Sequence, residues 1–410
     1  MKVLLGVCGS IAAYKTFDLA RLLVNNGHEV KVVLTKGAKE FVRPQVYKYL
    51  GVKEVFSSMD DFKYPNNEAQ NSTVLHIELA KWADKFVIAP LSANTLSKLA
   101  HGAANDLLSS IFLAIDQTKQ ILLFPAMNTN MLTHPFVKEN FDLVEKVKTL
   151  PQVYVSPTLT GELACGDVGA GKLAPIEVIS ELIDTLDFNS NNKKVVITTG
   201  ATISSVDPVR YLTNASSGKT GYEMARELLK SGFSVEVIAG KNATEKLDLL
   251  LSHPNYSLIR VVSTRDMLEA ALKSVIDASV YISAAAISDI EFLQGDSKLK
   301  KNQLTDSLKI STAPDVLKNI LELKNPALKV IGFAAETNLT EEILLEKWNR
   351  KKVDLLIGTH VSSGLTNNDK EAKGFQTDQA TYSLLRDGNI FFNGQLSKRE
   401  LSKKVLQEFI

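Results

Sequence analysis

The sequence contains few cysteines, no long apolar run and almost no net charge, and each of these shortages excludes a class of protein. Cys8 and Cys165 are the only cysteines among 410 residues, which is too few for a disulfide framework and favours a reducing, cytoplasmic setting. No apolar run approaches the ~20 residues that a membrane-spanning helix needs. The 47 basic and 46 acidic residues leave a net charge of +1, so no long-range field is available to gather nucleic acid or an anionic membrane.

The sequence does contain a repeated alternation of short apolar segments and amphipathic segments, with 45% hydrophobic and 23% charged residues. This pattern is typical of doubly wound α/β domains, in which helices cover both faces of a mostly parallel sheet. The polar, asparagine-rich segment 186–194 interrupts it, and a new strand pattern follows directly. The sequence therefore predicts two Rossmann-like domains, residues 1–188 and 189–410. Strands are expected at 2–7, 29–34, 85–89, 120–124 and 153–155, and then at 194–199, 234–239, 257–262, 280–284, 329–333 and 354–357.

Small and polar residues follow several expected strands of the first half, at the positions where open α/β sheets bind ligands. Segment 9–15, Gly-Ser-Ile-Ala-Ala-Tyr-Lys, opens a helix with small residues that leave backbone N–H groups accessible to a phosphate. It lacks the Gly-x-Gly-x-x-Gly spacing of nicotinamide-dependent oxidoreductases, which argues against a dinucleotide site. Segments 89–98 and 125–128 follow two further strands. Helix capping is the competing explanation for the serine and asparagine residues of these segments.

Two residues of the first half are candidates for chemistry. Cys165 lies in the glycine-punctuated segment 161–169, which predicts an accessible thiol on a mobile loop, whereas Cys8 ends an apolar strand and is expected to be packed. An ordinary surface thiol is the alternative for Cys165. His76 opens a short alternating segment, and a structural role is its alternative. No histidine has a cysteine or acid partner at metal-ligand spacing, so no zinc site is predicted.

Taken in order, segment 9–15, His76 and segments 89–95, 125–128 and 161–169 resemble the motifs of the flavin-dependent cysteine decarboxylases. The match is closest to the phosphopantothenoylcysteine decarboxylases of coenzyme A biosynthesis. The resemblance implies that FMN oxidises the substrate thiol to a thioaldehyde, that carbon dioxide then leaves, and that reduced flavin returns a hydride to the enethiol. It also implies a homo-oligomer, commonly a trimer, with FMN buried between subunits.

The same resemblance implies roles for individual residues. His76 would support proton movement and decarboxylation, Asn128 would bind the substrate carboxylate, and Cys165 would donate the proton that allows the enethiol to be reduced. These roles suit the chemistry, because a carboxylate must be held and partly desolvated and a weak acid must reach the intermediate. The residues that would hold FMN are Gly9, Ser10, Thr35, Ser92, Asn94, Thr95 and Lys98.

The second half carries a dense run of small and polar residues at 207–221, which suits backbone contact with phosphate at a helix N-terminus. It is not a Walker A sequence, because the Gly-Lys-Thr at 218–220 lacks the preceding glycine at the required spacing. A well-capped loop is the competing explanation. Segment 283–289 ends an expected strand in an acid, and the basic segment 298–301 follows. An acid after a strand near lysines permits a metal-triphosphate site.

This half resembles the phosphopantothenate–cysteine ligases, in which CTP activates the carboxylate of 4'-phosphopantothenate as an acyl-cytidylate and L-cysteine displaces CMP. The resemblance implies Mg2+ at the phosphates, a contact from Asn214 that orients the acyl-cytidylate, and dimeric contacts between ligase domains. Lysines suit the site because negative charge grows on the departing pyrophosphate. The residues that would bind CTP are Asp289, Lys298, Pro314, Asp315, Val316, Leu317, Phe333, Lys347 and Lys351.

Together the two resemblances predict a bifunctional enzyme that first ligates and then decarboxylates. Segment 201–206, Ala215 and Ile290 depart from the ligase pattern and bear on the affinity of the phosphopantothenate pocket. One alternative is a ligase joined to a degenerate flavin domain. The other is a flavin-binding regulatory subunit that inhibits a phosphatase. That protein would have no use for a complete set of His76, Asn128 and Cys165 or for a nucleotide-binding half.

Overall fold

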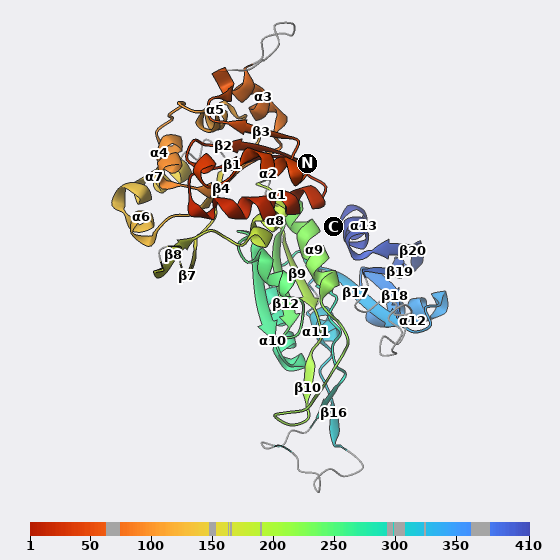
Figure 1. Cartoon of the computed structure of the whole chain (residues 1–410). Helices are drawn as coiled ribbons and strands as arrows, with labels where there is room; N and C mark the ends of the chain where they lie inside the picture. Colours follow the sequence, from red (N-terminus) through yellow and green to blue (C-terminus); the bar gives the residue numbers. More distant parts are fainter. Residues whose placement is uncertain are drawn as a thin grey trace. The chain divides into compact units, whose positions relative to one another are not determined.

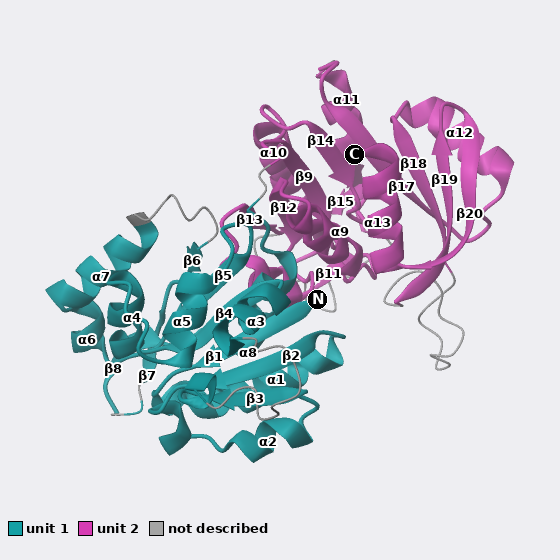
Figure 2. Cartoon of the chain, turned by 90° about the horizontal axis from the view of Figure 1, so that it is seen from above, with its two compact units in different colours: residues 1–188 teal, residues 189–410 magenta. Residues whose placement is uncertain are grey.

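The computed structural model divides the chain into two compact units, Met1–Phe188 and Asn189–Ile410, which Figure 2 colours separately. Each unit has its own buried apolar cores, so each is described by itself. The structure describes residues 1–62, 74–146, 153–162, 164, 166–188, 191–292, 298, 308–323, 325–361 and 378–410.

The first unit is built on a parallel sheet with the strand order β3-β2-β1-β4-β5-β6 (Figure 2), of which Figure 1 labels β1 to β4. Every pairing in this sheet is parallel. The strand order reverses between β1 and β4, and a doubly wound sheet binds ligands outside the carboxyl ends of its strands at such a point. The strands are β1 (Lys2–Val7), β2 (Glu29–Leu34), β3 (Glu54–Ser57), β4 (Lys85–Leu91), β5 (Gln120–Pro125) and β6 (Val153–Val155).

Helices cover both faces of this sheet, because its central strands have no face that could meet water. All seven residues of β4 are buried, for example. Helices α3, α4, α5 and α7 contribute side chains to one apolar cluster, whereas α1 and α8 pack against each other elsewhere. The helical segments are η1 (Ile11–Tyr14), α1 (Lys15–Asn25), η2 (Ala38–Glu40), α2 (Pro44–Tyr49), η3 (Asp60–Phe62), α3 (Leu75–Trp82), α4 (Ala93–Ala100), α5 (Leu107–Ala114), α6 (Thr129–Thr133), α7 (Pro135–Lys146) and α8 (Ile176–Thr185).

The second unit is built on a larger sheet with the order β13-β12-β9-β14-β17-β18-β19-β20. Its first six strands run parallel, and β19 and β20 are added antiparallel at one edge. Two short ladders, β10–β11 and β15–β16, lie outside it. The strands are β9 (Lys194–Thr199), β10 (Ile203–Ser205), β11 (Tyr211–Thr213), β12 (Ser234–Gly240), β13 (Tyr256–Val261), β14 (Val280–Ser283), β15 (Ile290–Phe292), β16 (Ile310–Thr312), β17 (Lys329–Glu336), β18 (Leu355–His360), β19 (Gln379–Arg386) and β20 (Asn389–Ser397).

Two separate apolar clusters cover the two faces of this second sheet. Successive strand residues alternate between them, as Val195 and Val196 do. Helices α9 and α13 belong to the cluster with Val195, and α10, α11 and α12 belong to the cluster with Val196. The helical segments are α9 (Lys219–Lys230), η4 (Glu245–Leu250), α10 (Thr264–Ser274), α11 (Val316–Glu322), α12 (Glu341–Lys351) and α13 (Lys398–Phe409).

The expected fold class, two doubly wound and mostly parallel α/β sheets, is confirmed. Sequence analysis missed β3, the antiparallel pair β19–β20 and a short hairpin formed by β7 (Leu159–Glu162) and β8 (Val168–Lys172). It also took the segment that begins at His76 as alternating, whereas this segment lies in helix α3. Leu75 and Leu79 are buried there at helical spacing.

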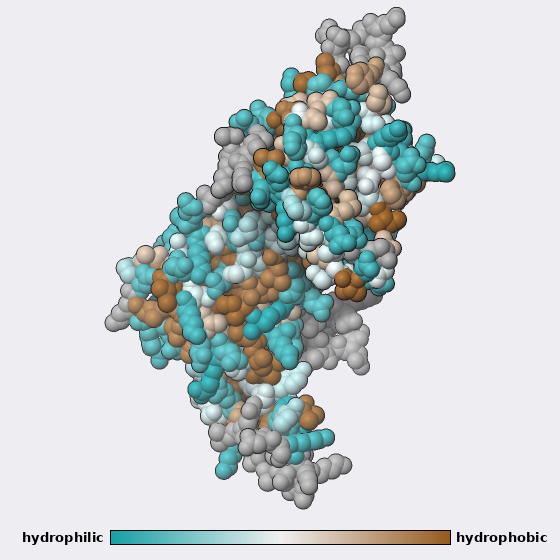
Figure 3. Space-filling model, turned by 90° about the vertical axis from the view of Figure 1, so that its left-hand side faces the viewer, coloured by the Kyte–Doolittle hydropathy of each residue, from teal (hydrophilic) through white to brown (hydrophobic). Residues whose placement is uncertain are grey.

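The surface of the molecule is mixed rather than uniformly polar. Figure 3 shows one face, on which hydrophobic side chains gather in one continuous area and are dispersed elsewhere among hydrophilic ones. None of the helices within the described ranges has the length and apolar content to cross a membrane.

Candidate active sites

Loops that follow β1, β2 and β5 meet at the carboxyl edge of the first sheet. Gly9, after β1, approaches the loop after β2 so closely that a Cβ on Gly9 would lie 2.9 Å from the Cα of Gly37. The Ser10 hydroxyl donates to the carbonyl oxygen of Ala126, after β5, at 3.4 Å. Because no side chain fits between Gly9 and Gly37, these two loops pack backbone against backbone. We call this meeting point of the three loops the cradle.

Most of the predicted flavin-binding hydroxyls cap local turns around this cradle. Ser10, Thr35 and Ser92 each accept a hydrogen bond from a backbone N–H two or three residues further on, at 3.2–3.4 Å. Capping was the structural alternative for Ser92, and the structure shows that contact directly. Thr95 is buried and Asn94 is exposed in the first turn of α4. The structure therefore brings Gly9, Ser10 and Thr35 to one edge, with Ser92 and Thr95 after the adjacent strand β4.

Cys8 is packed at the base of this region, as its apolar context predicted. The side chain is completely buried, and its N–H donates to the carbonyl oxygen of Pro90 at 3.3 Å. Burial raises the pKa of the Cys8 thiol to about 11, although hydrogen bonds with Thr95 and Ser92 oppose the rise. The thiol therefore stays protonated and acts as a small apolar group.

Lys98 is ion-paired rather than solvated. Its Nζ lies 2.6 Å from Oδ2 of Asp106, which also caps α5 through the backbone N–H of Ser109. Burial by itself would raise the pKa of Asp106, but hydrogen bonds from Lys98 and Ser109 outweigh it, and the pKa is lowered. The carboxylate therefore stays charged and fixes the start of α5 relative to α4.

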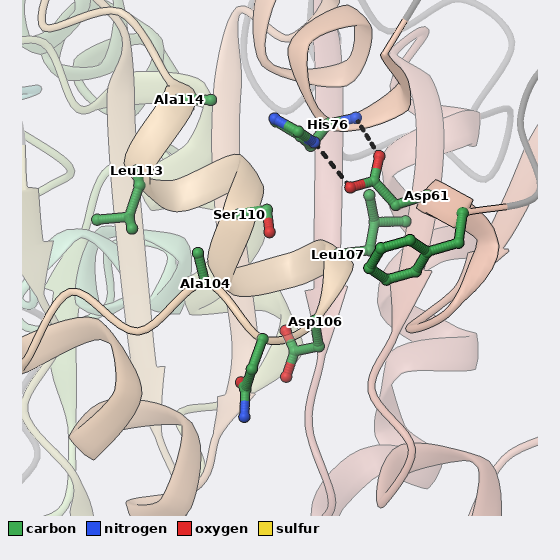
Figure 4. Close-up of a pocket in the computed structure, with 10 residues that line it drawn as sticks. Asp61, His76, Ala104, Asp106, Leu107, Ser110, Leu113 and Ala114 are labelled. Carbon is green, nitrogen blue, oxygen red and sulfur yellow. Dashed lines mark hydrogen bonds and ion pairs between the residues drawn. The ribbon is translucent and has the colours of Figure 1, made fainter.

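His76 forms one wall of a pocket of about 440 Å³ (Figure 4). Its Nδ1 lies 2.7 Å from Oδ2 of Asp61, and its backbone N–H donates to Oδ1 of the same carboxylate at 3.1 Å. Asp106 and Ser110 line the pocket as well. A carboxylate that accepts from Nδ1–H holds the imidazole in one tautomer and leaves Nε2 free to exchange a proton. Sequence analysis missed Asp61, because a partner 15 residues away has no fixed spacing.

The hairpin β7–β8 is docked on the loop that carries Asn128. The N–H of Met127 donates to the carbonyl oxygen of Gly171 at 3.0 Å, and Oγ1 of Thr129 donates to the carbonyl oxygen of Ala170 at 2.6 Å. Asn128 itself caps α6 through Oδ1. Cys165, which falls between β7 and β8 in the sequence, is outside the described residues.

Gly171 is required for this docking. Its φ is +121°, and a Cβ there would lie 2.0 Å from the carbonyl oxygen of Met127. We expect Gly171→Ala to cost about 1–3 kcal/mol of stability and to speed hydrogen exchange of the Met127 amide by at least ~10-fold. Gly161→Ala is the matched control, because its Cβ would only touch Lys172 at 3.5 Å. Unchanged exchange in the Gly171 variant would show that the hairpin is not held by this contact.

The second unit has a larger pocket, of about 1050 Å³, at the carboxyl edge of its sheet. It extends over residues that end β9, β14, β17 and β18, so it occupies the position expected of a doubly wound sheet. Lys298 is exposed and is not among the lining residues. The predicted residues that do line this pocket are Asn214, Asp289, Pro314, Asp315, Val316, Leu317, Phe333, Lys347 and Lys351.

One wall of this second pocket carries basic side chains, of which Lys347 is ion-paired with Glu336. Lys347, Arg350 and Lys351 project from the last turns of α12. Lys351 donates to the carbonyl oxygen of Phe333 at 3.3 Å. Burial lowers the pKa of Lys351, and the charge of Lys347 lowers it further. A bound anion would relieve that repulsion. Arg350 was missed by sequence analysis.

Asn214 holds the loop after β14. Its Nδ2 donates to the carbonyl oxygens of Ala286 and Ile287 at 3.1 and 3.2 Å. All three residues line the pocket. The amide therefore joins two loops at the edge of the site, and its Oδ1 remains available to the pocket.

The structure shows two doubly wound α/β units, and family models place both among flavoproteins. Residues 1–187 match the family model "Flavoprotein", and residues 190–410 match "DNA/pantothenate metabolism flavoprotein C-terminal domain". The coenzyme A biosynthesis bifunctional protein CoaBC of Haemophilus influenzae is 36% identical over 373 residues, which cover 90% of this chain and 89% of the relative. Its namesake in Bacillus subtilis is 35% identical over 414 residues, with 99% and 96% covered.

The chain belongs to this family of bifunctional coenzyme A biosynthesis proteins, as the resemblance predicted. A solved structure of a PPC decarboxylase mutant with pantothenoylaminoethenethiol is 36% identical, covering 44% of this chain and 95% of that one, with a TM-score of 0.39.

Proposed function

We propose that the first unit is an FMN-dependent phosphopantothenoylcysteine decarboxylase and the second a CTP-dependent phosphopantothenate–cysteine ligase. One observation carries the proposal: residues from segments as distant as Asn214 and Lys351 line one pocket of about 1050 Å³ with basic side chains on one wall. A nucleotide and a second phosphorylated substrate would fill such a space. A phosphatase-inhibiting subunit would not need it.

FMN fits the cradle of the first unit. Gly9 and Gly37 let two loop backbones come into contact there, and Ser10, Thr35 and Thr95 place hydroxyls along the same edge. When bound, FMN supplies oxidation of the substrate thiol and the later return of a hydride. The protein would hold the phosphate on backbone N–H groups at the start of η1, with Lys98 as the nearby cation.

The reacting end of the decarboxylase substrate would be handled by three side chains. His76, with Asp61 on Nδ1, would accept or donate a proton at Nε2. Asn128 would hold the carboxylate through its amide until carbon dioxide leaves. Cys165 would protonate the enethiol. The β7–β8 hairpin, between whose strands Cys165 falls in the sequence, is docked on the Asn128 loop.

Asp61 is expected to position His76. Asp61→Asn keeps the volume but can donate to Nδ1, which favours the wrong tautomer, so we expect decarboxylase kcat to fall by about 10²-fold or more. Nitrogen NMR of labelled histidine should then show the proton moving from Nδ1 to Nε2. Asp60→Asn is the control, because Asp60 only accepts from the Ser57 N–H, as asparagine can. A wild-type decarboxylase rate in the Asp61 variant would contradict the proposal that Asp61 positions His76.

In the ligase unit, an oxygen of the phosphopantothenate carboxylate would attack the α-phosphorus of CTP, and pyrophosphate would leave. The amine of L-cysteine would then attack the acyl carbon, and CMP would leave. Lys347, Arg350 and Lys351 would stabilise charge on the phosphates. Asp289, which lines the pocket, would help to hold Mg2+, and the ion would supply positive charge to the phosphates.

Large apolar side chains are exposed around the first site. Phe62 and Leu113 line the His76 pocket and are 80% and 50% exposed, and Ile11 and Tyr14 in η1 are 54% and 55% exposed. Exposed apolar side chains that border a binding site mark a surface that a ligand or another chain covers. They support a homo-oligomer that completes the flavin site between subunits, which we expect to be trimeric.

Product analysis by mass spectrometry tests the proposal. Purified protein with FMN should convert 4'-phosphopantothenate, L-cysteine, CTP and Mg2+ to 4'-phosphopantetheine. Accumulation of 4'-phosphopantothenoylcysteine would support the ligase activity and would show that the first unit does not decarboxylate this substrate. Absence of any product, with ATP as well as CTP, would overturn the assignment.

A further inference from the structure

The ligase pocket has a second pair of cations, which the predicted CTP-binding residues do not include. Lys219 is the first residue of α9, Lys398 is the first residue of α13, and both line the pocket. Helices α9 and α13 pack against each other and belong to the apolar cluster on one face of the sheet. Lys347 and Lys351 lie on α12, which packs on the opposite face. Cations therefore border the pocket from both sides of the sheet edge.

The ammonium group of Lys398 is buried, and burial disfavours its charged form. Only 7% of the residue is exposed. Burial lowers the pKa of its ammonium group, Lys219 lowers it further, and Asp378 and Glu223 act against the shift. The lysine is therefore buried beside a like charge, an arrangement that a bound anion would stabilise.

Asp378 contacts both lysines of this pair. It lies 3.0 Å from Nζ of Lys219, and its carbonyl oxygen accepts from the backbone N–H of Lys398 at 3.0 Å. Its side chain is 86% exposed, and an ion pair in solvent is weak. A phosphate dianion could therefore compete with Asp378 for Lys219. The N-terminal ends of two 12-residue helices add to the attraction.

We propose that Lys219 and Lys398 form a phosphate-binding subsite on the α9–α13 side of the ligase pocket. The proposal rests on the ligase function, which brings two phosphorylated substrates into one pocket. The subsite holds either the triphosphate of CTP or the 4'-phosphate of phosphopantothenate. In both cases the buried Lys398 supplies a positive charge in a fixed position, and the more exposed Lys219 supplies one whose side chain can move.

Steady-state ligase kinetics of Lys398→Met and Lys219→Met in the full-length protein test this subsite. Methionine keeps the length of the buried stem and removes the charge. We expect the KM of one phosphorylated substrate to rise at least ~10-fold, with the KM of L-cysteine within about two-fold. A rise for CTP places the triphosphate there, and a rise for phosphopantothenate places the 4'-phosphate there. Lys398→Arg should recover most of the affinity.

The control is Lys403→Met, which removes an exposed lysine from the same helix outside the pocket. An equal effect of this control, or unchanged KM values in both pocket variants, would overturn the subsite. If Lys398→Met fails to fold, the more exposed Lys219→Met decides alone. If wild-type protein shows no ligation, the proposed function fails. Titration with inorganic pyrophosphate then tests whether the subsite exists, since Lys398→Met and Lys219→Met should bind pyrophosphate at least ~10-fold more weakly than the wild-type protein.

Discussion

Cys165→Ser should stop the first unit at the enethiol and leave ligation intact. A thiol has an ordinary pKa near 8.5, whereas a serine hydroxyl is a far weaker acid, so protonation of the enethiol should slow by about 10²–10⁴-fold. Flavin binding and release of carbon dioxide do not need this proton. Mass spectrometry should therefore show 4'-phosphopantothenoylcysteine consumed and a product two hydrogens lighter than 4'-phosphopantetheine accumulating.

Cys8→Ala is the matched control for this experiment. Cys8 is completely buried and its thiol stays protonated, so its loss should lower stability by about 1 kcal/mol without changing the product. Full turnover to 4'-phosphopantetheine by the Cys165 variant would remove the proposed proton donor. An enethiol that accumulates equally in both variants would point to a packing defect instead.

Asn214→Asp should disable ligation selectively. The change removes both donors to the carbonyl oxygens of Ala286 and Ile287 and brings a negative charge toward oxygens and toward anionic substrates. We expect ligase kcat/KM to fall by about 10²-fold or more, which corresponds to ~2.7 kcal/mol. Decarboxylation of supplied 4'-phosphopantothenoylcysteine should stay within about two-fold of the wild-type rate.

Asn389→Asp gives the comparison for this change. Asn389 also donates from Nδ2 to a backbone carbonyl, that of Asp387, but it does not line the pocket. It should leave both activities near wild type. If Asn214→Asp slowed both reactions equally, the two units could not be working independently, and a ligase rate unchanged by the substitution would exclude Asn214 from the site.

Strands buried on both faces were predictable, whereas edge strands were recognised unevenly: β6 and β13 were predicted, and β3 and β20 were not. The segment 85–91 reads as a continuous apolar run because every residue of β4 is buried. Strand β20 alternates exposed and partly buried residues, which is the pattern of a half-buried strand, but its polar content and the glycine at 394 concealed it. Strand β3 has no fully buried residue, so its apolar signal is weak.

The candidate sites divide in the same way. Gly9 and Ser10 belong to a local motif of small residues after a strand, and the roles of Asn214 and Lys351 were implied by the family resemblance. Asp61, Arg350 and Lys398 carry no such local signature, whereas Lys219 lies in the small, polar segment 207–221 for which phosphate contact was predicted. Ser397 and Glu400 form a capping box that marks where α13 begins. Nothing in that box indicates that Lys398 lines the pocket at the ends of β9, β14, β17 and β18.

The sequence by itself determined the two doubly wound units, the family and the local motifs, since apolar periodicity and turn chemistry act over a few residues. Contacts between charged residues that are far apart in the sequence could be seen only in the tertiary structure. It placed Asp61 on His76, docked the β7–β8 hairpin on the Asn128 loop, and brought Lys219 and Lys398 to the pocket edge opposite α12. Such contacts depend on strand order and on the packing of helices across the sheet, which join segments far apart in the chain.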